Sequence, residues 1–168
     1  PAAFRAARLA PPSGTLPVKV EQMDDLLDVF RRAPDPRDRN TRYRIGPVLT
    51  LIALALLAGR REIAEIARFA TTLTQPLRRR LNLPLKQGTK RFHQVPGYDV
   101  FYQVLTRMDP EAFATRLTDW LQHHHGQLPA ALDDDVRNCA PGDLYVKVRP
   151  EPPAAALSVA RHQLISVA

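Results

Sequence analysis

The sequence contains very little cysteine, little glycine and few aromatic residues. Cys139 is the only cysteine among 168 residues, beside seven glycines and 7% aromatic residues. A single cysteine excludes an internal disulfide bond and a cysteine-based zinc finger, and it fits a reducing compartment. Apolar residues make up 45% of the chain and charged residues 24%, which is close to globular averages. We therefore expect a cytoplasmic protein built around an ordinary hydrophobic core.

The sequence also lacks a hydrophobic run long enough to span a membrane. Its longest apolar stretch without a charge, residues 45–59, has 15 positions that include Gly46, Pro47 and Thr50. A spanning helix needs about 20 consecutive apolar residues. Charged segments flank the stretch on both sides. We therefore predict no membrane association, and instead a central helix that starts around Pro47, is buried on most faces and ends at Gly59.

The 16 prolines are unevenly distributed and suggest where the compact part lies. They gather near both ends, at residues 11–17 and 141–153, and prolines in such clusters mark loops. We expect a flexible leader over residues 1–18, a helical domain over residues 19–128, and a separate tail over residues 129–168.

Apolar residues recur at three- and four-residue spacing through the middle of the chain, which is typical of amphipathic helices. Asp99 and Asp109 are expected N-caps, and Pro110 suits a first helical position. The fold class that we predict is mainly α, a bundle of about six helices with a short β-leaning C-terminal tail. The expected helices are residues 20–30, 47–58, 61–73, 77–83, 100–108 and 110–125.

Three adjacent carboxylates lie near the start of this tail, in the segment LDDD at residues 132–135. Carboxylates at the end of a strand are suitable ligands for Mg²⁺. Neighbouring side chains of a strand face opposite sides, so the candidates are Asp133 together with Asp135, or Asp134 alone. An acidic turn without a metal is the alternative.

Two other patterns also have a structural explanation beside a functional one. Three consecutive histidines, residues 123–125, would point about 100° apart on a helix and would not converge on a metal; we expect them to cap the helix or to be exposed. Residues 61–81 resemble a helix-turn-helix in outline, with a basic second helix. Two packed helices with a basic exterior explain the same pattern equally well.

Basic residues are abundant, and they are clustered. The chain has 24 Lys and Arg against 17 Asp and Glu, a net charge of +7. Residues 31–44 hold six arginines, and residues 78–91 hold six Lys or Arg. Such clusters indicate a polyanionic partner. Solvated faces that only keep the protein soluble are the alternative interpretation.

The order of the segments resembles a known family over roughly residues 24–138. The resemblance is to the N-terminal region of bacterial insertion-sequence transposases of the H-repeat-associated group, whose helical part is called the DDE-transposase-associated domain. The positions that carry it are Asp35-Pro36-Arg37, Tyr43, Ala58-Gly59, Ile66-Ala67, Phe69-Ala70, Pro96, Phe101, Leu105, Asp109-Pro110 and Trp120.

The resemblance implies a helical domain ahead of an RNase H-like domain that binds Mg²⁺ and cleaves and transfers DNA strands. Asp133 matches the family's first catalytic and metal-binding aspartate. The family continues with Gly and Lys at that strand, whereas this sequence has Asp134 and Asp135. The chain also stops before the family's second aspartate and final glutamate. We therefore expect residues 129–168 to be a truncated beginning of the catalytic domain, and the chain by itself to be an inactive fragment or remnant that binds no metal.

The resemblance and the basic clusters together predict a DNA-binding and assembly module that contacts phosphates, with a homo-oligomer as one form of assembly. The alternative is a protein-interaction module for dimerisation or docking that does not bind DNA directly. The residues expected to bind DNA are Arg37, Arg39, Arg42, Arg44, Arg78, Arg79, Arg80, Lys86, Lys90 and Arg91.

Overall fold

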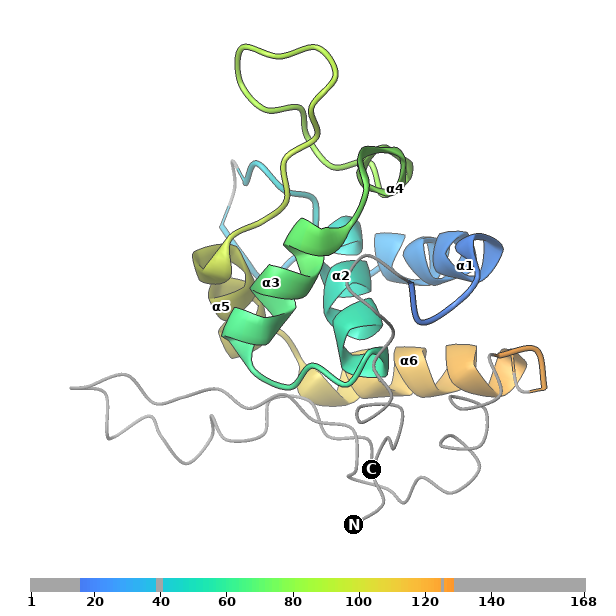
Figure 1. The fold of residues 1–168 in the computed structure, drawn as a ribbon. Helices are drawn as coiled ribbons and strands as arrows, with labels where there is room; N and C mark the ends of the chain where they lie inside the picture. Colours follow the sequence, from blue (N-terminus) through green and yellow to red (C-terminus); the bar gives the residue numbers. More distant parts are fainter. Residues whose placement is uncertain (1–15, 39–40, 125, 129–168) are drawn as a thin grey trace.

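The computed structural model describes residues 16–38, 41–124 and 126–128, and these residues fold into a bundle of six helices (Figure 1). Within them, an antiparallel bridge joins Leu85 and His93. The prediction of a mainly helical fold with about six helices is confirmed. The β-leaning tail, residues 129–168, lies outside the described residues. The helices are α1 Val20–Arg31, α2 Ile45–Leu57, α3 Ile63–Thr72, α4 Gln75–Arg80, α5 Tyr98–Arg107 and α6 Pro110–His123.

Helix α2 forms the centre of the bundle. Every one of its residues is buried, and it packs against α1, α3 and α5 (Figure 1). The uncharged stretch is therefore enclosed by other helices, because a helix that is apolar on all sides is stable only where its whole circumference is covered. In the part of the chain that the structure describes, no helix combines the length and apolar character needed to cross a membrane.

The two ends of α2 follow local rules of helix termination. The helix begins at Ile45, two residues before the predicted start, and Pro47 lies in its first turn, where a missing N–H costs no hydrogen bond. Gly59 ends it, as predicted, with a φ of 82° in the left-handed region. The amides of Gly59 and Arg60 donate to the carbonyls of Leu56 and Ala55, at 2.9 and 2.8 Å, and so satisfy the last turn.

Helix α1 approaches α2 and α6 closely. A Cβ at Gly46 would lie 3.2 Å from the Cα of Arg31, so the absence of a side chain there lets the end of α1 pack on the start of α2. At α6, the rings of Phe30 and Phe113 stack with their centroids 5.0 Å apart. The apolar stripe of α1 is thereby covered on two sides, which fixes this helix in the bundle.

The expected caps of the last two helices have different outcomes. Asp109 caps α6 as predicted, because its carboxylate accepts hydrogen bonds from the amides of Glu111 and Ala112 at 3.0 and 3.3 Å. Asp99 is not an N-cap: α5 begins two residues earlier than predicted, at Tyr98 with Gly97 as its cap, and Asp99 lies inside the first turn. A carboxylate in the first turn also interacts favourably with the helix dipole. The sequence pattern alone therefore does not distinguish an aspartate at the N-cap from one in the first turn.

Candidate nucleic-acid interface

The basic cluster of residues 78–91 lies on α4 and on a projecting loop that follows it. We call residues 84–94 the basic hairpin. Its two arms are joined by hydrogen bonds from the amide of Lys86 to the Phe92 carbonyl, 2.7 Å, and from the amide of Gln94 to the Pro84 carbonyl, 2.8 Å. Gly88 turns the tip with a φ of 81°. Figure 1 shows that the hairpin extends away from the bundle beyond α4.

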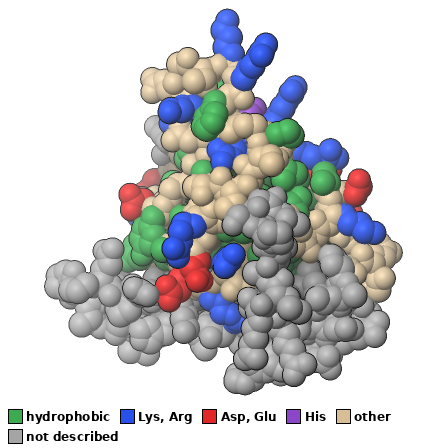
Figure 2. Space-filling view, viewed as in Figure 1, with side chains coloured by type: hydrophobic (Ala, Val, Ile, Leu, Met, Phe, Trp, Pro, Cys, Tyr) green, Lys and Arg blue, Asp and Glu red, His purple; other side chains and the backbone are tan. Residues whose placement is uncertain are grey.

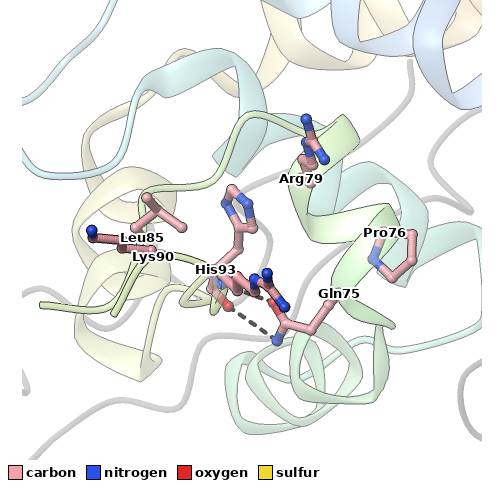
Figure 3. A pocket seen from close by; sticks show the side chains of 7 residues that line it. Gln75, Pro76, Arg79, Leu85, Lys90 and His93 are labelled. Atoms are coloured by element: carbon pink, nitrogen blue, oxygen red, sulfur yellow. Dashed lines mark hydrogen bonds between the residues drawn. The ribbon is translucent and has the colours of Figure 1, made fainter. Parts of the chain in front are cut away.

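Polar side chains of α4 hold the base of the hairpin. Gln75 makes two hydrogen bonds with the backbone of His93: its carbonyl accepts from the His93 amide at 2.7 Å, and its amide group donates to the His93 carbonyl at 3.4 Å (Figure 3). The His93 ring nitrogen Nδ1 lies 2.7 Å from the Leu83 carbonyl. The hairpin is therefore joined to the helix by several separate contacts.

Arg78 completes this attachment from inside the protein. Its residue is only 9% exposed, and its guanidinium donates to the carbonyls of Thr71, Leu73 and His93 at 2.7, 2.8 and 3.2 Å. The guanidinium also lies 5.7 Å from the centre of the Phe92 ring. All three guanidinium nitrogens thus donate to carbonyls of α3, the α3–α4 turn and the hairpin. Arg78 therefore has a structural role and does not point outward.

Between α4 and the hairpin is an open cleft of about 680 Å³ with a basic lining (Figure 3). Arg79 lines it from α4, and Lys90 and Arg91 line it from the hairpin. No carboxylate is among the lining residues, and the sequence has no Asp or Glu at residues 66–98. Figure 2 shows Lys and Arg side chains gathered at this end of the molecule. Cations without nearby carboxylates create a strongly positive local potential.

The basic cluster of residues 31–44 contacts the basic cluster of residues 78–91 at the hairpin. The Arg42 guanidinium donates to the Leu85 carbonyl at 3.0 Å, and the Tyr43 hydroxyl donates to the Val95 carbonyl at 2.9 Å. Arg44, the residue before α2, is exposed. Segments that are about 40 residues apart in the sequence therefore contribute to a single basic surface, which we define by its outward cations Arg42, Arg44, Arg79, Lys86, Lys90 and Arg91.

Two other predicted phosphate contacts are engaged in ion pairs within the chain. Arg37, with a side chain only 3% exposed, pairs with Asp35 and also donates to the Tyr43 carbonyl at 2.6 Å. Burial raises the pKa of Asp35, but hydrogen bonds from Arg37 outweigh that effect and hold the pKa below its usual value. Arg80 donates to both carboxylate oxygens of Asp24, at 2.6 to 2.9 Å, and these bonds raise the pKa of Arg80.

Two features of the surface gave no signal in the sequence patterns. Leu85 and Phe92 are the exposed large apolar side chains of the described residues, at 43% and 44% exposure. Both lie on the basic hairpin, and Lys86 approaches the Phe92 ring to 5.9 Å. The roles of Gln75 and His93 were also missed, because their hydrogen bonds go to backbone atoms of a loop whose course the sequence does not fix.

The helix-turn-helix outline of residues 61–81 is not present, and neither is a pair of packed helices, because α3 packs against α2 and α5 and α4 does not pack extensively on α3. Helix α4 has six residues, so its length is about 9 Å. One of its three arginines, Arg78, faces inward and another, Arg80, pairs with Asp24. A helix this short, with one outward arginine, does not present the row of side chains by which a recognition helix reads a groove.

The candidate metal residues are not brought together in the part of the chain described here. Asp133 lies outside that part, as do His125 and Arg39, and no group of three or more His, Cys, Asp or Glu within it could hold a metal ion. At the end of α6, His123 is exposed as expected. His124 is the C-cap residue of α6, but its side chain is buried, with its ring 4.7 Å from that of Trp120.

A single family model matches the part of the chain that contains most of the described helices. Residues 27–121 match the model of the family described as DDE_Tnp_1-associated. The chain is also similar to an uncharacterized protein in the dhlA 3′ region of Xanthobacter autotrophicus, at 32% identity over 96 residues, which is 56% of this chain and 30% of that protein. The match thus spans about a third of that relative's length. No solved structure matches the chain significantly.

Proposed function

The chain belongs to the DDE_Tnp_1-associated family, which gives it a transposase-related role, and from this premise we propose that its helical domain binds DNA. In this proposal the domain is the DNA-binding and assembly portion of an insertion-sequence DDE transposase. The observation that carries the proposal is the basic surface: Arg79, Lys90 and Arg91 line a cleft without carboxylates, and the Arg42 guanidinium reaches the same hairpin at Leu85.

Burial and pairing divide the predicted DNA-binding residues into two groups. We assign phosphate contact to the cations of the basic surface, Arg42, Arg44, Arg79, Lys86, Lys90 and Arg91. Arg37, Arg78 and Arg80 already donate to Asp35, to backbone carbonyls and to Asp24. A guanidinium held by several such hydrogen bonds would have to break them before it could bind a phosphate, whereas Arg42 donates from one nitrogen, Nη2, to the Leu85 carbonyl and has further N–H groups for a phosphate. In our proposal Arg37, Arg78 and Arg80 have a structural role and do not contact DNA.

The proposal predicts a salt-dependent affinity for duplex DNA. Each phosphate that a cation neutralises releases counterions and adds about 0.9 to the slope of log affinity against log salt. Six such contacts set an upper limit of about 5 for that slope. Affinity that is absent at low salt, or indifferent to salt, would contradict the proposal.

A pair of double variants tests whether this surface is responsible. Lys90→Ala/Arg91→Ala removes two charges from the basic surface, and we expect the slope to fall by roughly two. Arg107→Ala/Arg116→Ala removes two charges from α5 and α6, of which α6 lies at the other end of the molecule in Figure 1. We expect this control to leave the slope unchanged. Equal effects of both variants would show that the charge total, and not the surface, determines binding.

The exposed Leu85 and Phe92 side chains support a second candidate, a protein-interaction module without direct DNA binding. In that case the basic surface would meet an acidic partner, such as another copy of the chain. Charge reversal by Arg79→Glu distinguishes the two, because Arg79 is exposed and its replacement should not disturb the core. Loss of self-association in a protein that itself shows no affinity for DNA would favour the interaction module.

For catalysis, we propose that this chain alone does not cut DNA. The family's chemistry requires a divalent metal such as Mg²⁺, whose ligands are carboxylates of the catalytic domain. Asp133 is the candidate here, and its neighbours Asp134 and Asp135 depart from the family's motif. Nicking of supercoiled DNA with and without Mg²⁺ is the test. Cleavage that is abolished by Asp133→Asn would show that the chain is active.

A further inference from the structure

We infer that the basic hairpin enters the major groove of duplex DNA as a two-stranded ribbon. The inference rests on the proposed function and adds which element penetrates the duplex and in which groove. It starts from the position of the hairpin, which projects from the bundle beyond α4 (Figure 1), and from the exposure of all residues from Leu85 to Phe92.

The dimensions of the hairpin fit the major groove and not the minor groove. Paired arms lie about 4.8 Å apart, and side chains on both sides bring a ribbon to roughly 10 Å. The major groove is about 12 Å wide and 8.5 Å deep, whereas the minor groove is about 6 Å wide. The paired arms, residues 84–86 and 92–94, have about three residues each, or roughly 10 Å, and the turn at residues 87–91 follows them. The hairpin is therefore long enough to reach the floor of the major groove.

The exposed side chains near the tip have the chemistry that base edges and phosphates require. Gln87 and Arg91 are exposed, and their planar groups match the paired acceptors and donors that adenine and guanine present in the major groove. In this inference Arg91 reaches a base edge, and its charge still lies close enough to the phosphates to contribute to the salt slope. Lys86 and Lys90 supply point charges for phosphates on either side. Thr89 is exposed as well, but its hydroxyl donates to the Lys86 carbonyl at 2.9 Å and so stabilises the turn.

The base of the hairpin is fixed well enough to position such a ribbon. Gln75 and Arg78 hold His93 from α4, and Arg42 holds Leu85 from the segment before α2. An element that is held in its bound geometry before binding loses less conformational freedom on association. Arg78 is thus a positioning residue in this inference: it does not contact DNA but aligns the residues that do.

A duplex with a blocked groove tests the inference directly. In DNA whose cytosines carry glucosylated 5-hydroxymethyl groups, the sugars project from cytosine C5 into the major groove, while the phosphates are unchanged. We expect the full chain to bind this duplex at least about tenfold more weakly than the unmodified one, which is the size of one lost base-edge contact. Distamycin, which fills the minor groove, should leave the affinity unchanged.

The outcomes separate this inference from the proposed function. Salt-dependent binding that is insensitive to glucosylation would overturn the inference and leave the proposed function intact. Competition by distamycin would overturn it in favour of the minor groove, and tighter binding to single strands would overturn it in favour of a strand-binding loop. Absence of binding to any DNA at low salt would overturn both.

A substitution that conserves charge gives a second, independent measurement. Arg91→Lys keeps the charge of the tip but removes the planar fork that pairs with a base edge. We expect a severalfold loss of affinity with an unchanged salt slope. The control is Arg116→Lys on α6, which should change neither quantity. If Arg91→Lys binds like the unmodified protein, Arg91 acts only as a charge and the ribbon does not read the groove.

Discussion

Arg78 and Arg79 are adjacent arginines with opposite surroundings, and substitution of each by methionine tests the assignment of their roles. Arg78 is buried and donates three hydrogen bonds to backbone carbonyls, whereas Arg79 is exposed on the cleft. Methionine retains a flexible apolar stem and removes the guanidinium. The two variants therefore carry the same chemical change at neighbouring positions of one helix.

The expected loss of stability follows from the contacts of Arg78. A hydrogen bond from a charged donor contributes about 1.5–3 kcal/mol, so three of them at the lower end amount to about 4.5 kcal/mol. Two of the three carbonyls lie near the surface and can regain water, which recovers part of that loss. We expect Arg78→Met to lower the free energy of unfolding by about 3 kcal/mol, and Arg79→Met to change it by less than about 0.5 kcal/mol.

Urea unfolding followed by helical circular dichroism measures both values. The midpoint and the slope of the transition give the free energy of unfolding in water for each variant. A difference of about 3 kcal/mol between the two would support the inward position of Arg78. Equal stabilities, or a larger loss for Arg79→Met, would refute the reasoning, because they would show that the hairpin is not held by this guanidinium.

Two further predictions concern the core and the acid sensitivity of the fold. Leu54→Ala, at a fully buried position of α2, should lower the free energy of unfolding by about 2–5 kcal/mol through lost burial and a residual cavity; Leu85→Ala on the exposed hairpin is its control and should cost far less in the same urea assay. Arg37 lowers the pKa of Asp35, so the stability that this carboxylate contributes is present above its unfolded pKa of about 3.9 and is lost as the pH falls through the lower folded value. The stability difference between the protein and its Asp35→Asn variant should therefore shrink on acidification from pH 6 to below 4, and a constant difference would contradict this.

The sequence predictions agree best with the structure where the contacts that determine an element are local in the chain. The stripe of α1, the cap at Asp109 and the left-handed Gly59 all depend on residues within a few positions of one another, and each is found where the sequence predicts it. The burial of α2 follows from its composition, since a helix without a polar face has no side to turn to water. The family resemblance rests on the same local spacing and is confirmed over residues 27–121.

Only the tertiary structure decided which of the three arginines at residues 78–80 face outward. In sequence, residues 78–80 are three identical side chains on a helix of six residues, which is too short for its periodicity to separate an inner from an outer face. Arg78 bonds the nearby carbonyls of Thr71 and Leu73 and also that of His93, 15 positions away, whereas Arg80 bonds Asp24, 56 positions away. A long side chain with several donors adopts whichever contacts the fold brings within reach. The sequence therefore determined the helices, their buried faces and the amount of positive charge, whereas the packing of the hairpin against α4 decided which cations face outward, because burial and pairing depend on neighbours that are remote along the chain.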